Sequence, residues 1–196
     1  MKTIELNAAP RADFGKKASK GIRKSGSIPC VMYGGKYGED KALHFQIKEE
    51  DLRGLLYTPN VYLVNLSLKG KTYKAILKEV QFHPVKDTPL HLDFLEVFDD
   101  KPIVVELPVK LNGLAAGVRS GGKLSLDMRK LRVKGLYKDV PECLNIDVTS
   151  LELGKTIQVG GLHFDNLEMM NAKNAVVCAV KLTRAARGAA DQAEAE

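Results

Sequence analysis

The sequence predicts a mostly β protein with a few short helices, arranged as an N-terminal domain followed by a second β-rich domain. Apolar and polar residues alternate with period two over many short segments, which is typical of strands with one buried face. Two such segments, 61–68 and 72–82, flank the tight turn Lys69-Gly70-Lys71, and this arrangement predicts a hairpin. The composition agrees, because 44% hydrophobic and 28% charged residues are ordinary for a globular protein.

The first half is expected to contain two short helices among its strands. A helix over Ala18–Ser25 is weakened by Gly21, which costs about 1 kcal/mol relative to Ala inside a helix. A second helix over Lys48–Leu56 carries its acidic residues in the first turn, where the helix dipole favours them. The expected strands cover residues 3–7, 29–33, 43–47, 61–68, 72–82 and 91–97.

The break at Phe98–Pro102 is expected to separate the two domains, 1–97 and 98–184. Many short strands with regular turns in the second half favour a barrel or a sandwich. Pro108 lacks a backbone N–H, so its strand should lie at an edge or bend there. The expected strands cover residues 103–111, 123–133, 141–148, 155–159 and 175–182. The tail 185–196 has little to bury and is expected to be disordered.

Several classes of protein are disfavoured by what the chain lacks. No apolar run approaches the roughly 20 residues of a membrane span, and the N-terminus has no apolar signal-peptide core, so a cytoplasmic location is expected. Cys30, Cys143 and Cys178 form no C-x-x-C pair, which favours buried free thiols over a zinc site or a disulfide framework. No metal, cofactor, small-molecule substrate or catalytic group is predicted.

The positive charge is concentrated near the N-terminus. Residues 1–36 hold eight Lys/Arg against two Asp/Glu, whereas residues 97–196 hold 14 basic and 13 acidic side chains. A polyanionic partner should therefore meet the first half. The segment Arg11–Lys24 alone carries six basic side chains, which suits phosphate binding, although charge by itself equally fits a solvated loop. Tyr33 ends the short apolar run that follows the basic segment, and it could stack at that surface or belong to the core.

Two other constellations leave alternatives open. The glycine-rich segment 112–122 joins two expected strands and matches neither the P-loop nor the dinucleotide pattern, so a mobile or bulged connection is favoured over a nucleotide site. His91 and Asp93 lie on one face of their expected strand. They could contact RNA base edges or sugars, or simply form the solvated side of an antiparallel sheet. With His83 they form no closed metal-ligand set.

Dispersed motifs resemble a known family. The pattern R-x-x-x-G-K-x-A-S-x-x-[IL]-R from Arg11, followed by I-P-x-x-x-Y-G-G, resembles the start of the bacterial large-subunit ribosomal protein L-twenty-five family. The segments 78–84 (K-E-V-Q-F-H-P) and 91–94 (H-L-D-F) resemble its later signature. The second half, with V-E-L-P-V-K-L-N-G-L-A-A-G-V-R-S-G-G-K-L, resembles the added β domain of the longer, general-stress-protein CTC type.

This resemblance implies a β-barrel N-terminal domain that binds 5S ribosomal RNA at the irregular loop E, in a non-enzymatic, cytoplasmic protein of the large ribosomal subunit. The second domain would meet neighbouring ribosomal proteins or ribosomal RNA. The implied RNA contacts are Arg11, Lys16, Ser19, Lys20, Arg23, Tyr33, Lys78, His91 and Asp93.

The chain departs from the family pattern in three places. Gly21 stands where short members can carry a further arginine, and Lys20 and Lys78 stand where arginine and glutamine can occur. These exchanges remove a phosphate contact or a bidentate one. Two alternatives to a ribosomal role are a stress-related RNA-binding regulator acting off the ribosome and a nucleotide-binding protein using the glycine-rich segment.

Overall fold

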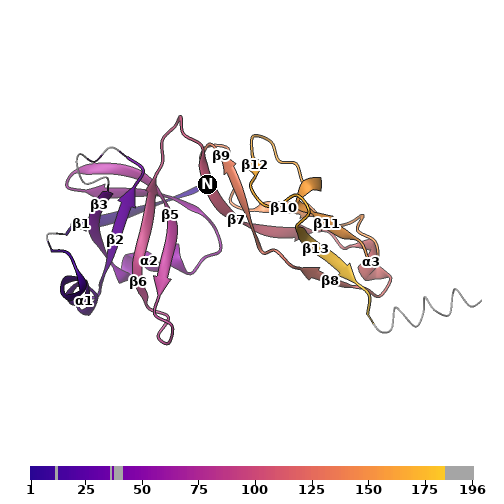
Figure 1. Ribbon diagram of the computed structural model, residues 1–196, viewed down its shortest axis with the longest axis horizontal. Helices are drawn as coiled ribbons and strands as arrows, with labels where there is room; N and C mark the ends of the chain where they lie inside the picture. The colour runs from indigo at the N-terminus through magenta and orange to yellow at the C-terminus, as the bar shows by residue number, and fades with distance from the viewer. Residues whose placement is uncertain (12, 36, 38–41, 184–196) are drawn as a thin grey trace, which may run out of the picture. The chain divides into compact units, whose positions relative to one another are not determined.

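In a computed structural model the chain folds into two compact units, each with its own β structure (Figure 1). The structure describes residues 1–11, 13–35, 37 and 42–183. The first unit is Met1–Ile103 together with Leu136–Lys138, and the second is Val104–Gly135 with the residues from Asp139 onward. The expected disordered tail lies outside the described residues. The predicted fold class, a mostly β chain with an N-terminal barrel and a second β-rich domain, is confirmed.

The first unit is a closed six-stranded barrel with strand order β1-β3-β2-β6-β5-β4. Parallel pairing of β1 with β4 closes it, β2 and β6 are also parallel, and the remaining neighbours are antiparallel. The hairpin predicted over 61–82 is β4 and β5. The strands are β1 (Lys2–Pro10), β2 (Ser27–Tyr33), β3 (Ala42–Lys48), β4 (Tyr62–Leu68), β5 (Lys71–Phe82) and β6 (Pro89–Glu96).

Alternate side chains of these strands fill the barrel. Phe45 of β3 and Phe94 of β6 are fully buried, with their ring centroids 5.8 Å apart. Burial of each ring contributes roughly 1.5–3 kcal/mol. Leu92 and Phe94 point inward, so the residues between and beside them, His91 and Asp93, face outward. The packing of the barrel therefore leaves the odd-numbered positions of this part of β6 available for function.

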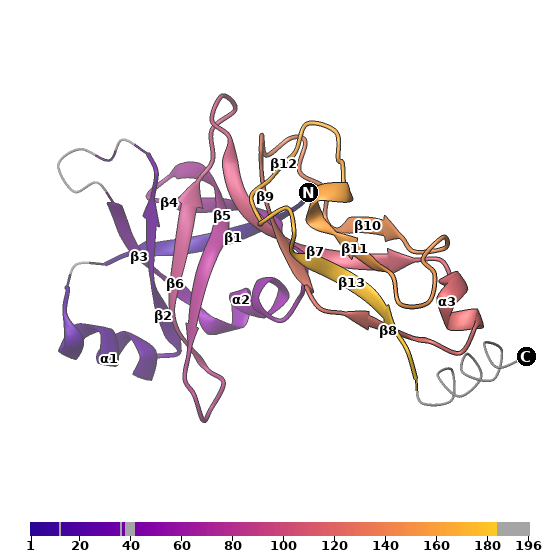
Figure 2. The ribbon, with the colours of Figure 1, turned by 45° about the vertical axis from the view of Figure 1, so that its right-hand side comes forward.

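Two helices accompany the barrel in different ways (Figure 2). Helix α1 (Lys16–Lys24) buries none of its residues and contacts β2 from outside. Helix α2 (Glu49–Leu56) buries Leu52 and Leu55 in the barrel core and carries three acids in its first turn. Both predicted helices exist, with ends one or two residues from those expected. Only α2 contributes to the core, so α1 is a surface element.

The second unit contains a four-stranded sheet, β10-β7-β9-β12, and a three-stranded sheet, β11-β13-β8. Its strands are β7 (Ile103–Asn112), β8 (Lys123–Leu126), β9 (Lys130–Gly135), β10 (Leu144–Asp147), β11 (Thr156–Gln158), β12 (Glu168–Met169) and β13 (Val176–Lys181). Of the two alternatives predicted for the strand with Pro108, an edge position is wrong, because β7 has a neighbour on each side, whereas a bend at Pro108 stays a prediction. Pro108 is tolerated because the pairing of β7 with β10 begins one residue later, at Val109.

The single strand expected over 123–133 is two strands in different sheets. The backbone N–H groups of Asp127 and Met128 both donate to the carbonyl of Val177, which ends the β8 ladder. The carbonyl of Arg129 then accepts from Val109 of β7, which begins the other sheet. The apolar positions change phase here, from Leu124, Leu126 and Met128 to Leu131 and Val133, and the prediction of one strand overlooked this signal.

The glycine-rich segment 112–122 contains a short helix, α3 (Ala116–Arg119), rather than only a loop between strands. A methyl group added at Gly117 would lie 2.5 Å from the backbone N of Leu153, and one at Gly122 would lie 2.7 Å from the carbonyl O of Gly117. These glycines are thus required by close backbone packing, which accounts for them without a bound phosphate.

The three cysteines are free. Cys30 lies in the barrel core and Cys178 in the core of the second unit, as expected, whereas Cys143 is only half-buried. Burial raises the pKa of both the Cys30 and the Cys178 thiols, and at Cys178 the nearby carboxylate of Asp127 adds to the effect.

Candidate nucleic-acid interface

The outward side chains of β2, β6 and β5 form one surface, the β2–β6–β5 face. Strand register fixes its layout, because Asp93 lies opposite Val31 of β2 on one side and Glu79 of β5 on the other. His91 lies opposite Gln81. Adjacent strands are about 4.8 Å apart, so these side chains form a compact polar patch outside the barrel.

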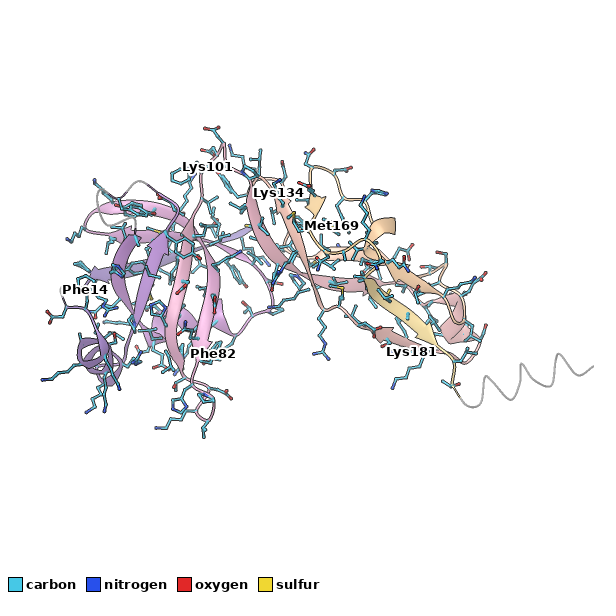
Figure 3. The ribbon with its side chains drawn as sticks, viewed as in Figure 1. Phe14, Phe82, Lys101, Lys134, Met169 and Lys181 are labelled. Atoms are coloured by element: carbon cyan, nitrogen blue, oxygen red, sulfur yellow. The ribbon has the colours of Figure 1, made fainter. Side chains whose placement is uncertain are left out.

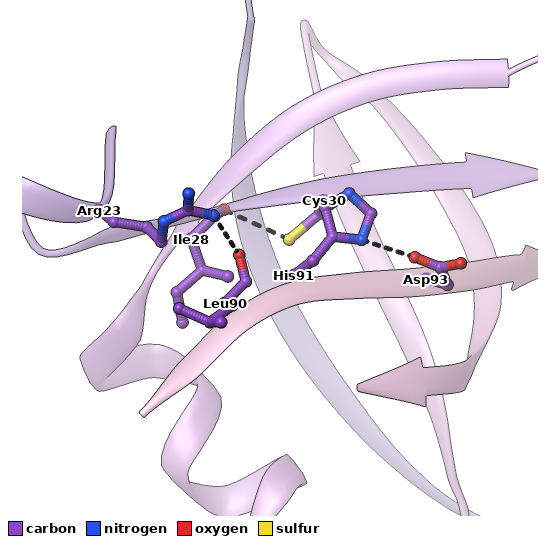
Figure 4. A network of polar contacts seen from close by, with 6 residues as sticks. All are labelled: Arg23, Ile28, Cys30, Leu90, His91 and Asp93. Carbon is purple, nitrogen blue, oxygen red and sulfur yellow. Dashed lines mark hydrogen bonds and ion pairs between the residues drawn. The ribbon is translucent and has the colours of Figure 1, made fainter. Parts of the chain in front are cut away.

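His91 and Asp93 are paired on this face. His91 Nδ1 lies 2.7 Å from Asp93 Oδ1, and the side chains are 29% and 27% exposed (Figure 4). The two atoms lie close together without hydrogen-bond geometry, and Nδ1 is buried, so Nε2 is the nitrogen that can meet a ligand. The two side chains lie side by side on one strand face, as predicted.

A β-bulge brings Lys78 onto the same face. The register of β5 against β6 shifts between Leu77, opposite Phe94, and Glu79, opposite Asp93. Lys78 is the extra residue, so Lys78 and Glu79 are both exposed on the outside of the barrel. Without the bulge, strict alternation would turn Glu79 toward the apolar core. The bulge thus places the predicted site residue Lys78 on the outside of the barrel beside Glu79, which lies opposite Asp93.

Tyr33 lies on the outer side of β2 and is half-buried, since its neighbour Met32 is the residue that enters the core. Burial, and then the carboxylates of Asp93 and Glu79, raise the pKa of Tyr33 above its ordinary value. The phenol therefore keeps its proton at neutral pH and can donate or accept a hydrogen bond. Of the two roles considered for Tyr33, the surface one agrees with this position.

Helix α1 presents the basic side chains. Lys16, Lys20 and Arg23 are exposed at positions i, i+4 and i+7, which lie on one stripe of a helix. The first turn holds no acid, so Lys16 sits at the positive end of the helix dipole, where an anion is stabilising. Arg23 Nη1 donates to the carbonyl O of Leu90 at 3.0 Å and so ties the helix to β6, one residue before His91 (Figure 4).

Arg11 and Ser19 brace the start of α1. Arg11 Nη2 donates to Ser19 Oγ at 3.1 Å, and Ser19 Oγ donates to the Gly15 carbonyl at 2.9 Å. The Ser19 hydroxyl thus joins the loop to the helix. Its position suits orienting Arg11, whereas the sequence had suggested it only as an RNA contact.

The charge of the whole interface is mixed. Basic side chains surround the face from α1, the preceding loop and the β5 bulge, while Asp93 and Glu79 occupy its centre. Carboxylates repel phosphates but accept hydrogen bonds from base amino groups. Phosphates are therefore suited to the periphery and base edges to the centre.

Other chemistries find little support in the described parts of the chain. Within them, no group of three or more His, Cys, Asp or Glu side chains is arranged to hold a metal ion. None of the helices described is long and apolar enough to cross a membrane.

Comparison with known proteins identifies the family. The Ribosomal L25p family matches residues 6–94, and the C-terminal domain of ribosomal protein TL5 matches residues 102–184. A protein of Porphyromonas gingivalis named large ribosomal subunit protein bL25 is 62% identical over 191 residues, covering 97% of this chain and 98% of the relative. The chain belongs to the ribosomal L25p family. The predicted family resemblance is confirmed.

Further L25p relatives cover the chain almost end to end. Proteins named large ribosomal subunit protein bL25 from Phocaeicola vulgatus and Azobacteroides pseudotrichonymphae are each 56% identical, over 193 and 192 residues, and cover 97% and 98% of this chain. The two alignments cover 98% and 100% of the lengths of these relatives. Every predicted site residue falls inside the segment 6–94 that matches the L25p model.

Sequence reasoning missed several members of this L25p surface. Glu79 and Gln81 lie on the β2–β6–β5 face, and His44 lies beside it on β3, opposite Val31. The alternation of β3 and β5 could have suggested His44 and Gln81. Glu79 needed a different signal, the phase change between Leu77 and Val80, where two polar residues stand together and mark the bulge.

Proposed function

We propose that this chain binds 5S ribosomal RNA as a structural, non-enzymatic component of the large ribosomal subunit, with the β2–β6–β5 face and helix α1 as its RNA-binding surface. Relatives named large ribosomal subunit protein align with this chain over nearly their whole length, which supports a ribosomal role. The mixed charge of the surface supports RNA over a simple polyanion.

The observation that carries the proposal is the hydrogen bond from Arg23 to Leu90. It holds the basic stripe of α1 beside the strand that carries the His91–Asp93 pair. Phosphate contacts position a protein on a nucleic acid, and side-chain contacts to base edges read its sequence. One surface thus combines both kinds of contact in a fixed arrangement.

The central pair favours an irregular RNA helix as the target. A regular A-form helix has a deep, narrow major groove that side chains cannot read, whereas distorted regions expose base edges. An imidazole Nε2 and the carboxylates of Asp93 and Glu79 can meet donors and acceptors on such edges. Loop E of 5S ribosomal RNA is the irregular helix that we propose.

Salt dependence of binding tests the phosphate contacts. Arg11, Lys16, Lys20, Arg23 and Lys78 are five candidate contacts, so the logarithm of affinity should fall against the logarithm of salt with a slope of about −4, at roughly 0.7–0.9 per contact. Filter binding to 5S ribosomal RNA across a salt series measures this slope. Absent or salt-independent binding would overturn the proposal.

A pair of variants in α1 tests the orientation of the surface. Arg23→Ala should weaken binding to every RNA and make the slope less negative by about 0.7–0.9, because one phosphate contact is lost. Lys24→Ala, an exposed lysine that points about 100° around the helix from Arg23, serves as the matched control and should change the slope less. Equal effects would mean that α1 contributes only diffuse charge.

We propose that the second unit meets neighbouring ribosomal proteins or ribosomal RNA. Co-sedimentation of the full chain with 50S particles tests the ribosomal role directly. A chain that binds RNA but does not sediment with the particles would support the alternative of a regulator acting off the ribosome.

The nucleotide-binding alternative is not favoured, because close packing against Leu153 already explains the glycine at position 117.

A further inference from the structure

Phe14, immediately before the basic helix, is a large aromatic side chain left in solvent. It is 63% exposed and projects from the loop that leads into α1 (Figure 3). Single exposed apolar residues are common on protein surfaces, so exposure alone carries no function. The surroundings of the ring distinguish it from an incidental surface residue.

The Phe14 ring is held from two sides by polar groups. His44 lies edge-to-face with it, at 5.1 Å between ring centroids and 76° between planes. The guanidinium carbon of Arg11 lies over the ring, 5.7 Å from its centroid. Arg11 is itself bonded to Ser19 of α1. The ring is thus oriented by its partners while most of its surface remains open.

Strand register places this aromatic pair beside the RNA-binding surface proposed above. His44 of β3 lies opposite Val31 of β2, and Val31 lies opposite Asp93 of β6. Two strand spacings amount to about 10 Å. Phe14 therefore lies on the β3 side of the proposed surface, just before the basic helix, and its partner His44 is about 10 Å from the base-reading strand β6.

We propose that Phe14, backed by His44 and Arg11, is a stacking platform for one unpaired nucleobase of the bound RNA. The inference rests on the proposed RNA-binding function and adds a contact type that neither phosphate binding nor edge reading supplies. Every nucleobase has a π face, so an aromatic ring binds an extruded base without regard to its hydrogen-bonding edge. An adjacent arginine strengthens such a site through cation–π attraction.

Fluorescence gives a direct test because the chain contains no tryptophan. Phe14→Trp introduces a single reporter, whose emission should be quenched when 5S ribosomal RNA is added, since a stacked base lies against the indole. Leu114→Trp is the control. Leu114 is 53% exposed and belongs to the second unit, outside the barrel that carries the proposed face. Its emission should stay unchanged.

Affinity measurements separate stacking from packing and from charge. Phe14→Leu and Phe14→Ala should each weaken 5S ribosomal RNA binding by between roughly 5-fold and 100-fold, the range for losing one base–aromatic stack. Phe14→Tyr should bind like the natural chain. The salt slope should not change in any of them, because no phosphate contact is removed. Thermal unfolding should be little altered, since the ring lies outside the core.

The outcomes distinguish the two proposals. If the natural chain fails to bind 5S ribosomal RNA, the proposed function fails. If the natural chain binds and Arg23→Ala weakens it, but Phe14→Leu binds equally well, the stacking platform alone is overturned. Loss of affinity without quenching of Phe14→Trp, or quenching without loss in Phe14→Leu, also overturns it.

Discussion

At the scale of single residues, the His91–Asp93 pair is the part of the proposed RNA-binding surface that suits base reading. The Asp93 carboxylate lies 2.7 Å from the buried Nδ1 of His91, which leaves Nε2 as the nitrogen that can meet a ligand. A histidine held in this way offers a directed hydrogen bond rather than a diffuse charge. Its contribution should therefore appear in selectivity between RNAs more than in total affinity.

Replacing His91 tests this role. His91→Ala should reduce the preference for 5S ribosomal RNA over a regular duplex by about 1–3 kcal/mol, the usual value of one good base contact, and leave the salt slope unchanged. Competition filter binding measures the preference. His163→Ala, an exposed histidine of the second unit, should have no effect. A uniform loss of binding to both RNAs would contradict a base-reading role.

At the scale of elements, α1 is held by its flanks more than by its own sequence. It has no side-chain cap at Gly15, no acid in its first turn and no buried residue. The bonds of Arg11 and Arg23 attach it to the preceding loop and to β6. Gly21 is the weakest position within it, because glycine loses the most backbone freedom on entering a helix.

Substitutions of Gly21 test the stability of α1 and its contribution to RNA binding at one position. A methyl group there would meet nothing within 4 Å, so Gly21→Ala should stabilise the chain by about 0.5–1 kcal/mol in denaturant unfolding. Gly21→Arg should also make the salt slope more negative by about 0.7–0.9. Gly54→Ala in α2, equally open, is the control that should raise stability without changing RNA binding. A stabilised Gly21→Arg with an unchanged slope would show that a side chain at position 21 does not reach phosphate.

Alternation and turn residues in the sequence predicted the strands well where consecutive strands pair with each other. Alternation and the turn at Lys69–Lys71 predicted the β4–β5 hairpin, and the outward placement of His91 and Asp93 followed from the same rule. The contact of Phe14 with His44 was not predictable, because it depends on which distant strand lies beside the loop. The bulge at Lys78 and the split of 123–133 were missed although the apolar residues change phase at both places, from Leu77 to Val80 and from Met128 to Leu131.

At the scale of the whole molecule, the chain divides into two compact units, each with its own buried residues. Every candidate RNA contact lies in the first unit, and the glycine packing around α3 lies in the second. Stability of one unit should therefore be separable from the binding activity of the other.

Gly117→Ala tests this separation. The added methyl group would lie 2.5 Å from Leu153 N, so the substitution should destabilise the second unit by about 1–3 kcal/mol. Amide hydrogen exchange should quicken in residues 104–135, while exchange in the barrel and affinity for 5S ribosomal RNA stay unchanged. Gly161→Ala in the same unit has open space and should leave exchange as it is. Weaker RNA binding in Gly117→Ala would show that the units are coupled.

The two buried cysteines allow the opening of each unit to be measured separately, by the rate at which each thiol is labelled. Cys30 is sealed in the barrel and Cys178 in the second unit, so each thiol can react with a bulky reagent only when its own unit opens. Their raised pKa values further slow the reaction in the closed state. The half-buried Cys143 should label before either. Mass spectrometry of the labelled chain would thus give the labelling rate of each thiol, and with it the rate at which each unit opens in the natural sequence. Bound RNA should slow the labelling of Cys30 alone.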